Sequence, residues 1–169
     1  EDISLTPHPK VTTSTGSILC EKVVVCGNAY VGELNKTLGG KVLPAGSYLI
    51  ATEPLPDAVC QSLLPTNVAA CDLSVALDYY RLSADKRLIF GGMCTYSGRH
   101  PKSIRNALLP KMLRVFPQLK GVKIEYEWGG MIGIGANRLP QIGRLNERLY
   151  YAQAYSGHGL NATHMAARL

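Results

Sequence analysis

The most constraining feature of the sequence is a strand that runs through a glycine-rich turn into a helix at the end of the chain. Residues 149–155 predict the strand, Gly157-His158-Gly159 forms the turn, and residues 160–169 predict the helix. The unpaired N–H groups and the positive end of the helix dipole then point to one place. This pattern occurs at sites for a ligand that carries or develops negative charge, but by itself it is more often a tight turn with an incidental histidine.

A second strand that ends at a glycine lies near the start of the chain. Residues 22–26 contain three consecutive valines, which is typical of a strand buried on both faces. Residues 17–20 predict a shorter strand before it. After Gly27, residues 30–38 predict a short helix that Gly39 and Gly40 close.

The middle of the chain predicts an antiparallel sheet with a helix across it. The strongest helix covers residues 101–116, where apolar residues recur every four positions, with Pro101 in the first turn and Pro117 after the end. Pro110 inside this helix costs about 3 kcal/mol unless the helix kinks. The remaining predictions are a turn at 43–46, a weak helical turn at 57–64, a hairpin turn at 83–86, and strands at 47–52, 75–82, 87–93 and 122–128.

Gly133-Ile134-Gly135 looks like the start of a dinucleotide fingerprint, but the rest of the motif is missing. The third glycine is replaced by Arg138, and Leu139-Pro140 prevents the helix that should follow. We therefore predict that these glycines bend a strand or let another segment approach closely.

Charge and cysteine content exclude several kinds of site. The net charge is +6, and nine Lys or Arg residues but no acid lie between Lys86 and Ile124. Such a run can attract nucleic acid or an anionic substrate. The absence of interleaved aromatic residues favours a solvated face, or one that meets an acidic neighbour, so we expect no nucleic-acid partner. The cations of the predicted helix and the segment before it are Arg99, Lys102, Arg105, Lys111 and Arg114.

The five cysteines are widely spaced and form no CxxC pair, which predicts reduced thiols in a cytoplasmic protein and no metal site. No stretch approaches the roughly 20 apolar residues that span a bilayer, so we expect no membrane association. The first ten residues have neither the basic start nor the apolar run of a signal peptide, and both ends of the chain look cut.

Five segments in collinear order together resemble FAD-dependent amine and amino-acid oxidases of the D-amino-acid-oxidase-like superfamily, and within it the γ-glutamylputrescine oxidase branch. They span most of the chain, and their order is more specific than any one of them. The segments are EKVVVCGNAYVGEL (21–34), SYLIATEPLP (47–56), LDYYRLSADKRLIFGG (77–92), RLPQIGRL (138–145) and YSGHGLNATHMAARL (155–169).

The resemblance implies an α+β fold in three segments. Residues 1–43 are expected to be part of an FAD-binding domain, residues 44–131 a substrate-binding domain, and residues 132–169 a return to the FAD-binding domain. The substrate domain is expected to be a mixed or antiparallel sheet with a covering helix, forming a roof over the flavin. The last segment is expected to be the strand–turn–helix part of a Rossmann-like FAD domain.

The resemblance also implies which residues hold the cofactor. Cys26 and Gly27 resemble the strand end whose backbone passes close to FAD. The turn at the final helix resembles the one whose amides face the pyrimidine edge of the flavin, where a helix N-terminus favours negative charge and so hydride acceptance. The residues of that turn are Gly157, His158, Gly159, Leu160 and Asn161.

The candidates for substrate binding lie in the expected substrate domain. We assign no certain catalytic side chain, and His158 is either a base or a structural hydrogen-bonding group. Tyr80 and Arg81 lie on a strand of the expected substrate domain. Arg81 suits a substrate carboxylate, or is an ordinary surface arginine. Trp128 either walls the substrate pocket or belongs to the core.

The implied activity is oxidation of a C–N bond of an amine, with hydride transfer to FAD, hydrolysis of the imine to an aldehyde, and reoxidation of the flavin by dioxygen. The alternatives are another amino-acid oxidase or dehydrogenase of the superfamily, or a basic binding module without catalysis. The family's N-terminal βαβ unit with its GxGxxG motif is absent from this sequence. We therefore expect a C-terminal portion with little FAD affinity and no activity alone, with open sheet edges that invite self-association.

Overall fold

The computed structural model describes residues 1–169 and confirms the α+β class, with antiparallel and mixed sheets. The chain divides into two units, one formed by residues 1–45 with 131–169 and the other by residues 46–130. The boundaries expected from the sequence were 43/44 and 131/132. The chain enters the second unit within β5 (Leu43–Thr52) and leaves it within β9 (Ile124–Ile134).

The first unit contains two small sheets. One is antiparallel, in the order β1-β2-β3, and the other is mixed, in the order β10-β11-β4. Within the mixed sheet β11 is antiparallel to β10 and parallel to β4. The elements are β1 (Asp2–Ser4), β2 (Lys10–Thr13), β3 (Gly16–Leu19), β4 (Val23–Val25), α1 (Lys36–Gly39), β10 (Gln141–Arg144), β11 (Leu149–Gln153) and α4 (Gly159–Ala166).

The core of the first unit lies around β4 and β11 and is formed by Val23, Val25, Val31, Leu38 and Leu149. The prediction that residues 22–26 are buried on both faces is wrong for this chain, because Val24 is 64% exposed while Val23 and Val25 are buried. One face of β4 packs on this core and the other is open. Whether open edges or faces lead to self-association stays a prediction.

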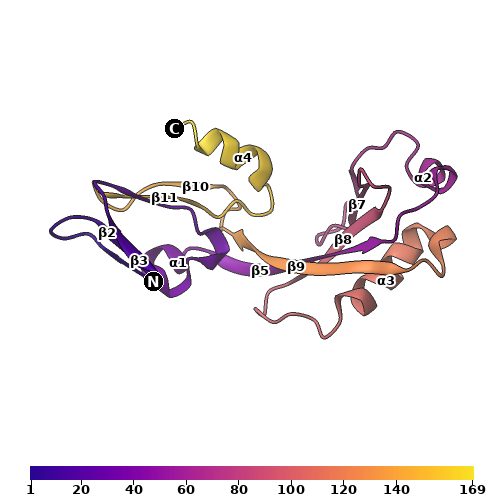
Figure 1. Cartoon of the computed structure of the whole chain (residues 1–169), viewed down its shortest axis with the longest axis horizontal. Helices are drawn as coiled ribbons and strands as arrows, with labels where there is room; N and C mark the ends of the chain where they lie inside the picture. Colours follow the sequence, from indigo (N-terminus) through magenta and orange to yellow (C-terminus); the bar gives the residue numbers. More distant parts are fainter. The chain divides into compact units, whose positions relative to one another are not determined.

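The second unit is a five-stranded sheet in the order β6-β7-β8-β5-β9, with α3 against it (Figure 1). Successive pairs from β6 to β5 are antiparallel. The predicted hairpin between β7 and β8 is confirmed by the bond from the Ser83 amide to the Arg87 carbonyl, 2.9 Å long. The elements are α2 (Asp57–Leu63), β6 (Ala70–Cys71), β7 (Tyr79–Leu82), β8 (Leu88–Thr95) and α3 (Ile104–Val115).

Helix α3 supplies the apolar layer that covers one face of this sheet. Its Leu108 and Met112 are fully buried against Tyr48, Ile50 and Phe90 of the sheet. Ser103 caps the helix through its side-chain oxygen, which accepts the Asn106 amide. The helix therefore begins after Pro101, which was predicted to lie in its first turn, and Pro110 lies inside it as expected.

Two further predictions of local structure, both between residues 30 and 46, are wrong. Residues 30–38 form two short 3-10 turns (Asn28–Tyr30 and Gly32–Leu34) and α1 in place of one helix. Gly32 has a φ of +47°, which interrupts a continuous helix. Residues 43–46 belong to β5 and do not form a turn.

Other strand boundaries differ from the predictions as well. Residues 75–78 precede β7 and are not part of a strand, because Asp72 holds this segment through bonds to the Ser74 and Asp78 amides. Strand β9 continues to Ile134, beyond the predicted end at residue 128. Strands β1, β2, β6 and β10 were not predicted, since they are short and lack regular alternation.

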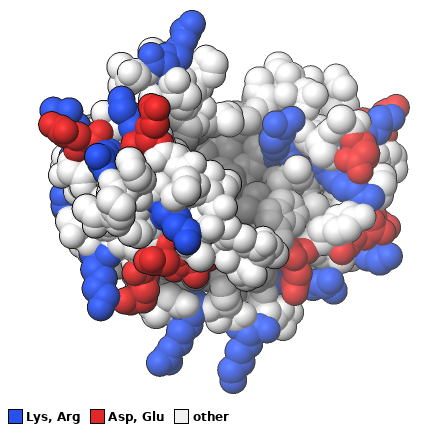
Figure 2. Space-filling view, turned by 60° about the vertical axis from the view of Figure 1, so that its left-hand side comes forward, with Lys and Arg blue, Asp and Glu red and all other residues white.

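The basic stretch between Lys86 and Ile124 is largely paired with acids of the same unit. Asp78, whose side chain is 3% exposed, pairs with Lys111 and with Arg114. On the face seen in Figure 2, basic and acidic side chains are interspersed. The run of cations in the sequence is therefore not a run of unpaired cations in the fold. The other pairs are Lys86–Asp57, Arg87–Asp85, Arg87–Glu125, Arg105–Glu127 and Lys123–Glu125.

Helix α3, with 12 residues, is the longest helix. None of the helices combines the length and hydropathy that crossing a bilayer requires.

We predict that Leu108→Ala destabilises the second unit by about 2–5 kcal/mol, because it leaves a cavity between α3 and the sheet. Val115→Ala is the matched control, since Val115 lies on the same helix but is 37% exposed and should cost less than about 1 kcal/mol. Urea unfolding followed by fluorescence of Trp128, the single tryptophan, reports on this unit. Equal losses in the two variants would contradict the packing described above.

Candidate functional site

Parallel pairing of β4 with β11 brings the predicted cofactor residues to one edge of the first unit. Val23, Val24 and Val25 lie beside Leu149, Tyr150 and Tyr151 in the same direction. The carboxyl ends of parallel strands meet at the same edge of a sheet. Residues 26–27, after β4, and residues 154–161, after β11, are therefore neighbours although far apart in sequence. Cys26, Gly27, Gly157, His158, Leu160 and Asn161 are exposed there, and Gly159 is half-buried.

The N-terminus of α4 is left without a side-chain partner. His158 is the N-cap residue but makes no side-chain capping bond, and the first turn contains no acid. Gly157 has a φ of +89°, and a Cβ added there would find only Ile132 Cδ1 within 4 Å, at 3.9 Å. The N-terminus of α4 therefore has backbone donors without a side-chain partner, beside free space at Gly157, as a group that accepts hydrogen bonds would require.

Asn28, which was not among the predicted site residues, ties the two strand ends together. Its Oδ1 accepts the Ala154 amide at 2.8 Å, and its backbone is left-handed with a φ of +47°. Asparagine adopts this conformation more readily than most residues. The signal in the sequence was a Gly-Asn pair directly after an apolar strand, which also fits an ordinary turn.

A shallow groove of about 490 Å³ runs beside α4. Its walls include the apolar Leu139, Pro140 and Met165 and the polar His158 and Asn161. The side chain of His158 makes no hydrogen bond. It therefore has no partner in the chain that would orient it as a base, and none that it would hold as a structural hydrogen-bonding group. Burial raises the pKa of the Tyr155 phenol in this groove, and the nearby Cys26 thiol adds to the shift.

Two of the predicted substrate residues, Tyr80 and Arg81, lie on opposite faces of the five-stranded sheet. Tyr80 pairs with Phe90, stacks on its ring at 5.8 Å, and meets Phe116 edge-on at 4.9 Å. It therefore packs on the α3 side. Arg81 pairs with Ile89 on the other face, which carries no helix, and is exposed, with only its Nε bonded to the Leu82 carbonyl at 3.2 Å.

Trp128 lies on the same open face as Arg81. A Cβ on its neighbour Gly129 would overlap the ring of Tyr48, a core residue on the α3 side. Because successive strand residues point to opposite faces, Trp128 points away from α3. Its side chain is 42% exposed, so it does not belong to the core. Tyr79 is also on this face, where its hydroxyl bonds Ser47 Oγ at 3.1 Å.

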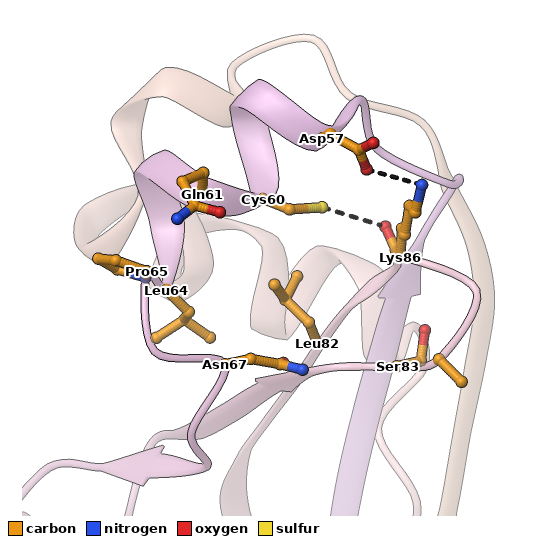
Figure 3. A pocket seen from close by; sticks show the side chains of 10 residues that line it. Asp57, Cys60, Gln61, Leu64, Pro65, Asn67, Leu82, Ser83 and Lys86 are labelled. Atoms are coloured by element: carbon orange, nitrogen blue, oxygen red, sulfur yellow. Dashed lines mark hydrogen bonds and ion pairs between the residues drawn. The ribbon is translucent and has the colours of Figure 1, made fainter.

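A second hollow, of about 480 Å³, lies between α2 and the β7–β8 hairpin (Figure 3). Its two charged side chains are paired with each other. Lys86 Nζ lies 2.6 Å from Asp57 Oδ1, and Cys60 Sγ donates to the Lys86 carbonyl at 3.8 Å. None of the predicted site residues lines it, so it is not the candidate site.

Nothing in the structure resembles a metal centre. No group of three or more His, Cys, Asp or Glu side chains could hold an ion, and all five cysteines are free.

Two curated relatives match nearly the whole chain. Gamma-glutamylputrescine oxidoreductase of Escherichia coli is 44% identical over 160 residues, and the match covers 94% of this chain and 38% of the relative. Probable oxidoreductase OrdL of Haemophilus influenzae is 40% identical over 164 residues, covering 95% of this chain and 37% of the relative. The chain thus spans less than half the length of these relatives.

Solved structures share the fold at lower identity. Glycine oxidase from Geobacillus kaustophilus superposes with a TM-score of 0.77 at 18% identity, covering 99% of this chain and 45% of that one. L-Proline dehydrogenase from P. horikoshii superposes with a TM-score of 0.72 at 21% identity, covering 94% and 44%.

The sequence profile of the family described as FAD dependent oxidoreductase matches residues 2–169, which is nearly the whole chain. The match includes both strand ends and the glycine turn that the fold brings to one edge. The chain therefore belongs to the FAD dependent oxidoreductase family.

Proposed function

We propose that this protein oxidises a C–N bond of an amine of the γ-glutamylputrescine type with FAD as cofactor. The observation that carries the proposal is the shared edge of β4 and β11, where the strand end at Gly27 and the uncapped N-terminus of α4 meet. The 44% identity to a relative named gamma-glutamylputrescine oxidoreductase supports the substrate class. Five unpaired cysteines support a reducing, cytoplasmic location.

The residues at this edge fit the pyrimidine end of a flavin. That end carries carbonyl and ring-nitrogen acceptors, and the α4 amides are donors without a side-chain partner. The exposed backbone of Gly157 and the half-buried backbone of Gly159 would let the ring approach the peptide groups closely. Cys26 and Gly27 would line the same end through their backbone. His158 and Asn161 flank the turn and would limit how the ring is placed.

Bound FAD would supply the redox chemistry, taking hydride from the carbon next to the amine nitrogen so that water releases an aldehyde, with dioxygen as the final acceptor. The protein would contribute orientation and charge stabilisation. The N-terminal amides and the dipole of α4 would hold the negative charge that develops at the pyrimidine edge. No side-chain nucleophile or metal is required.

On the substrate side, we assign Arg81 to the carboxylate of the glutamyl group and Trp128 to an apolar wall. Both stand on the open face of the five-stranded sheet, and the Arg81 side chain bonds only the Leu82 carbonyl. A guanidinium can bind a carboxylate through two parallel hydrogen bonds. Tyr80 packs against Phe90 and Phe116, so we now assign it to support of β7 and not to substrate contact.

The test of the proposed function is the colour of the protein. Flavin-loaded protein should be yellow and should bleach when γ-glutamylputrescine is added under nitrogen, then recover its colour in air. The 169-residue chain alone should stay colourless, because it carries no complete glycine-rich motif for the cofactor pyrophosphate. Bleaching by glycine or proline in place of the amine would assign a different substrate, and no bleaching by any amine would refute the proposal.

The carboxylate role of Arg81 predicts a change in KM. In the flavin-loaded protein of the bleaching experiment, Arg81→Gln should raise the KM for γ-glutamylputrescine about 10- to 100-fold, as expected for loss of a charged hydrogen bond, with a much smaller effect on putrescine, which has no carboxylate. Arg99→Gln is the control, since Arg99 is also an exposed arginine of the second unit. Equal effects on the two amines would exclude a carboxylate contact.

The flavin contact at Gly157 can be separated from backbone strain by a matched pair of variants. Gly157 and Gly121 have φ values of +89° and +88°, and neither has a close neighbour that a Cβ would strike. Alanine should therefore cost about 1–2 kcal/mol of stability at either position, because an L-residue is disfavoured in the left-handed conformation. In the flavin-loaded protein, only Gly157→Ala should weaken FAD binding, by about tenfold or more, as measured by flavin release. Equal affinity in the two variants would place the flavin elsewhere.

A further inference from the structure

The turn between β11 and α4 has an unusual backbone. Ala154, Ser156 and Gly157 all have positive φ, at 59°, 53° and 89°. Residues other than glycine seldom adopt this conformation and need surrounding contacts to hold them there. The turn sets the direction of α4, since the helix starts at Gly159.

One of those contacts comes from the segment that follows β4. Asn28 directly follows Gly27, and its Oδ1 accepts the amide of Ala154 at 2.8 Å. Ala154 is fully buried, so this amide cannot be satisfied by bulk water. Asn28 thus connects the strand end after β4 to the first left-handed residue of the turn.

Two further contacts come from the end of β9 and from Gly135, which follows it. The Gly133 carbonyl accepts the Ser156 amide at 2.8 Å, and Ser156 Oγ accepts the Gly135 amide at 3.2 Å. A Cβ on Gly133 would overlap Asn28 Oδ1. Gly133 therefore has to be glycine for the Asn28 side chain to reach Ala154, which explains a glycine pair that is not part of a dinucleotide fingerprint.

We propose that Asn28 is a positioning residue of the candidate flavin site. It holds the Ala154 amide, fixes the left-handed turn, and so determines where the α4 N-terminal amides point. That the site binds flavin rests on the proposed function, but the bond from Asn28 to Ala154 and the turn that it holds exist without the cofactor. Asn28 has no assigned contact with FAD and acts through the turn.

The inference is tested on the 169-residue chain by amide hydrogen exchange and by the NMR positions of the turn and α4 amides. Asn28→Gly removes the side-chain acceptor but tolerates the left-handed backbone. It should speed exchange at Ala154 by about tenfold or more and shift the resonances of Gly157, Gly159 and Leu160. Asn28→Asp keeps an acceptor at the same place and should restore both readouts toward wild type.

Asn67→Gly is the matched control, because Asn67 has a φ of +46° but lies in the second unit. It should leave the turn and the α4 amides unchanged. Unchanged α4 resonances in Asn28→Gly, or an Asn28→Asp variant that behaves like Asn28→Gly, would overturn the positioning role. Neither result depends on flavin, so failure here is distinguishable from failure of the bleaching experiment.

Discussion

The parallel pairing of β4 with β11 is the interaction on which the candidate site depends. The two strands come from opposite ends of the sequence, and three residue pairs align them in one direction. An antiparallel arrangement would have placed the turn after β11 at the far end from Gly27. Parallel pairing places both strand ends together, and the buried Val23, Val25 and Leu149 stabilise it. The uncapped end of α4 is then available at the same edge.

Much of the element order could be predicted from local patterns. Regular apolar spacing predicted α3, the Ser83–Lys86 turn predicted the hairpin, and the glycines at 157 and 159 predicted the start of α4. These signals are local and strong. The prediction failed where tertiary contacts decide the structure. Leu43–Gly46 joins β5 in spite of a turn-like Pro-Ala-Gly sequence. Strand β5 lies between β8 and β9, and such tertiary neighbours favour an extended backbone over a local turn.

The sequence also did not predict whether strand β4 is buried on one face or on both. Three consecutive valines in β4 have the same pattern whether or not a further layer covers the second face, and here Val24 is exposed. The basic stretch shows the same limit. Lys111 and Arg114 are charges without an acid nearby in sequence, yet they pair with the buried Asp78, which stands more than thirty positions earlier. Sequence composition counts charges, whereas the fold decides which of them remain unpaired.

The candidate site illustrates a third kind of information, which lies in single long-range hydrogen bonds. Nothing in the local pattern distinguishes Asn28 from any asparagine in a turn, and Gly133 looked like an incomplete cofactor motif. Their roles appear only together, because the side chain of one occupies the space that a Cβ of the other would fill. A strained turn needs such support if it is to hold a helix end in one direction. Since the donors of a helix N-terminus act on a ligand only when they point at it, the residues that fix the turn are as necessary to the site as those that line it.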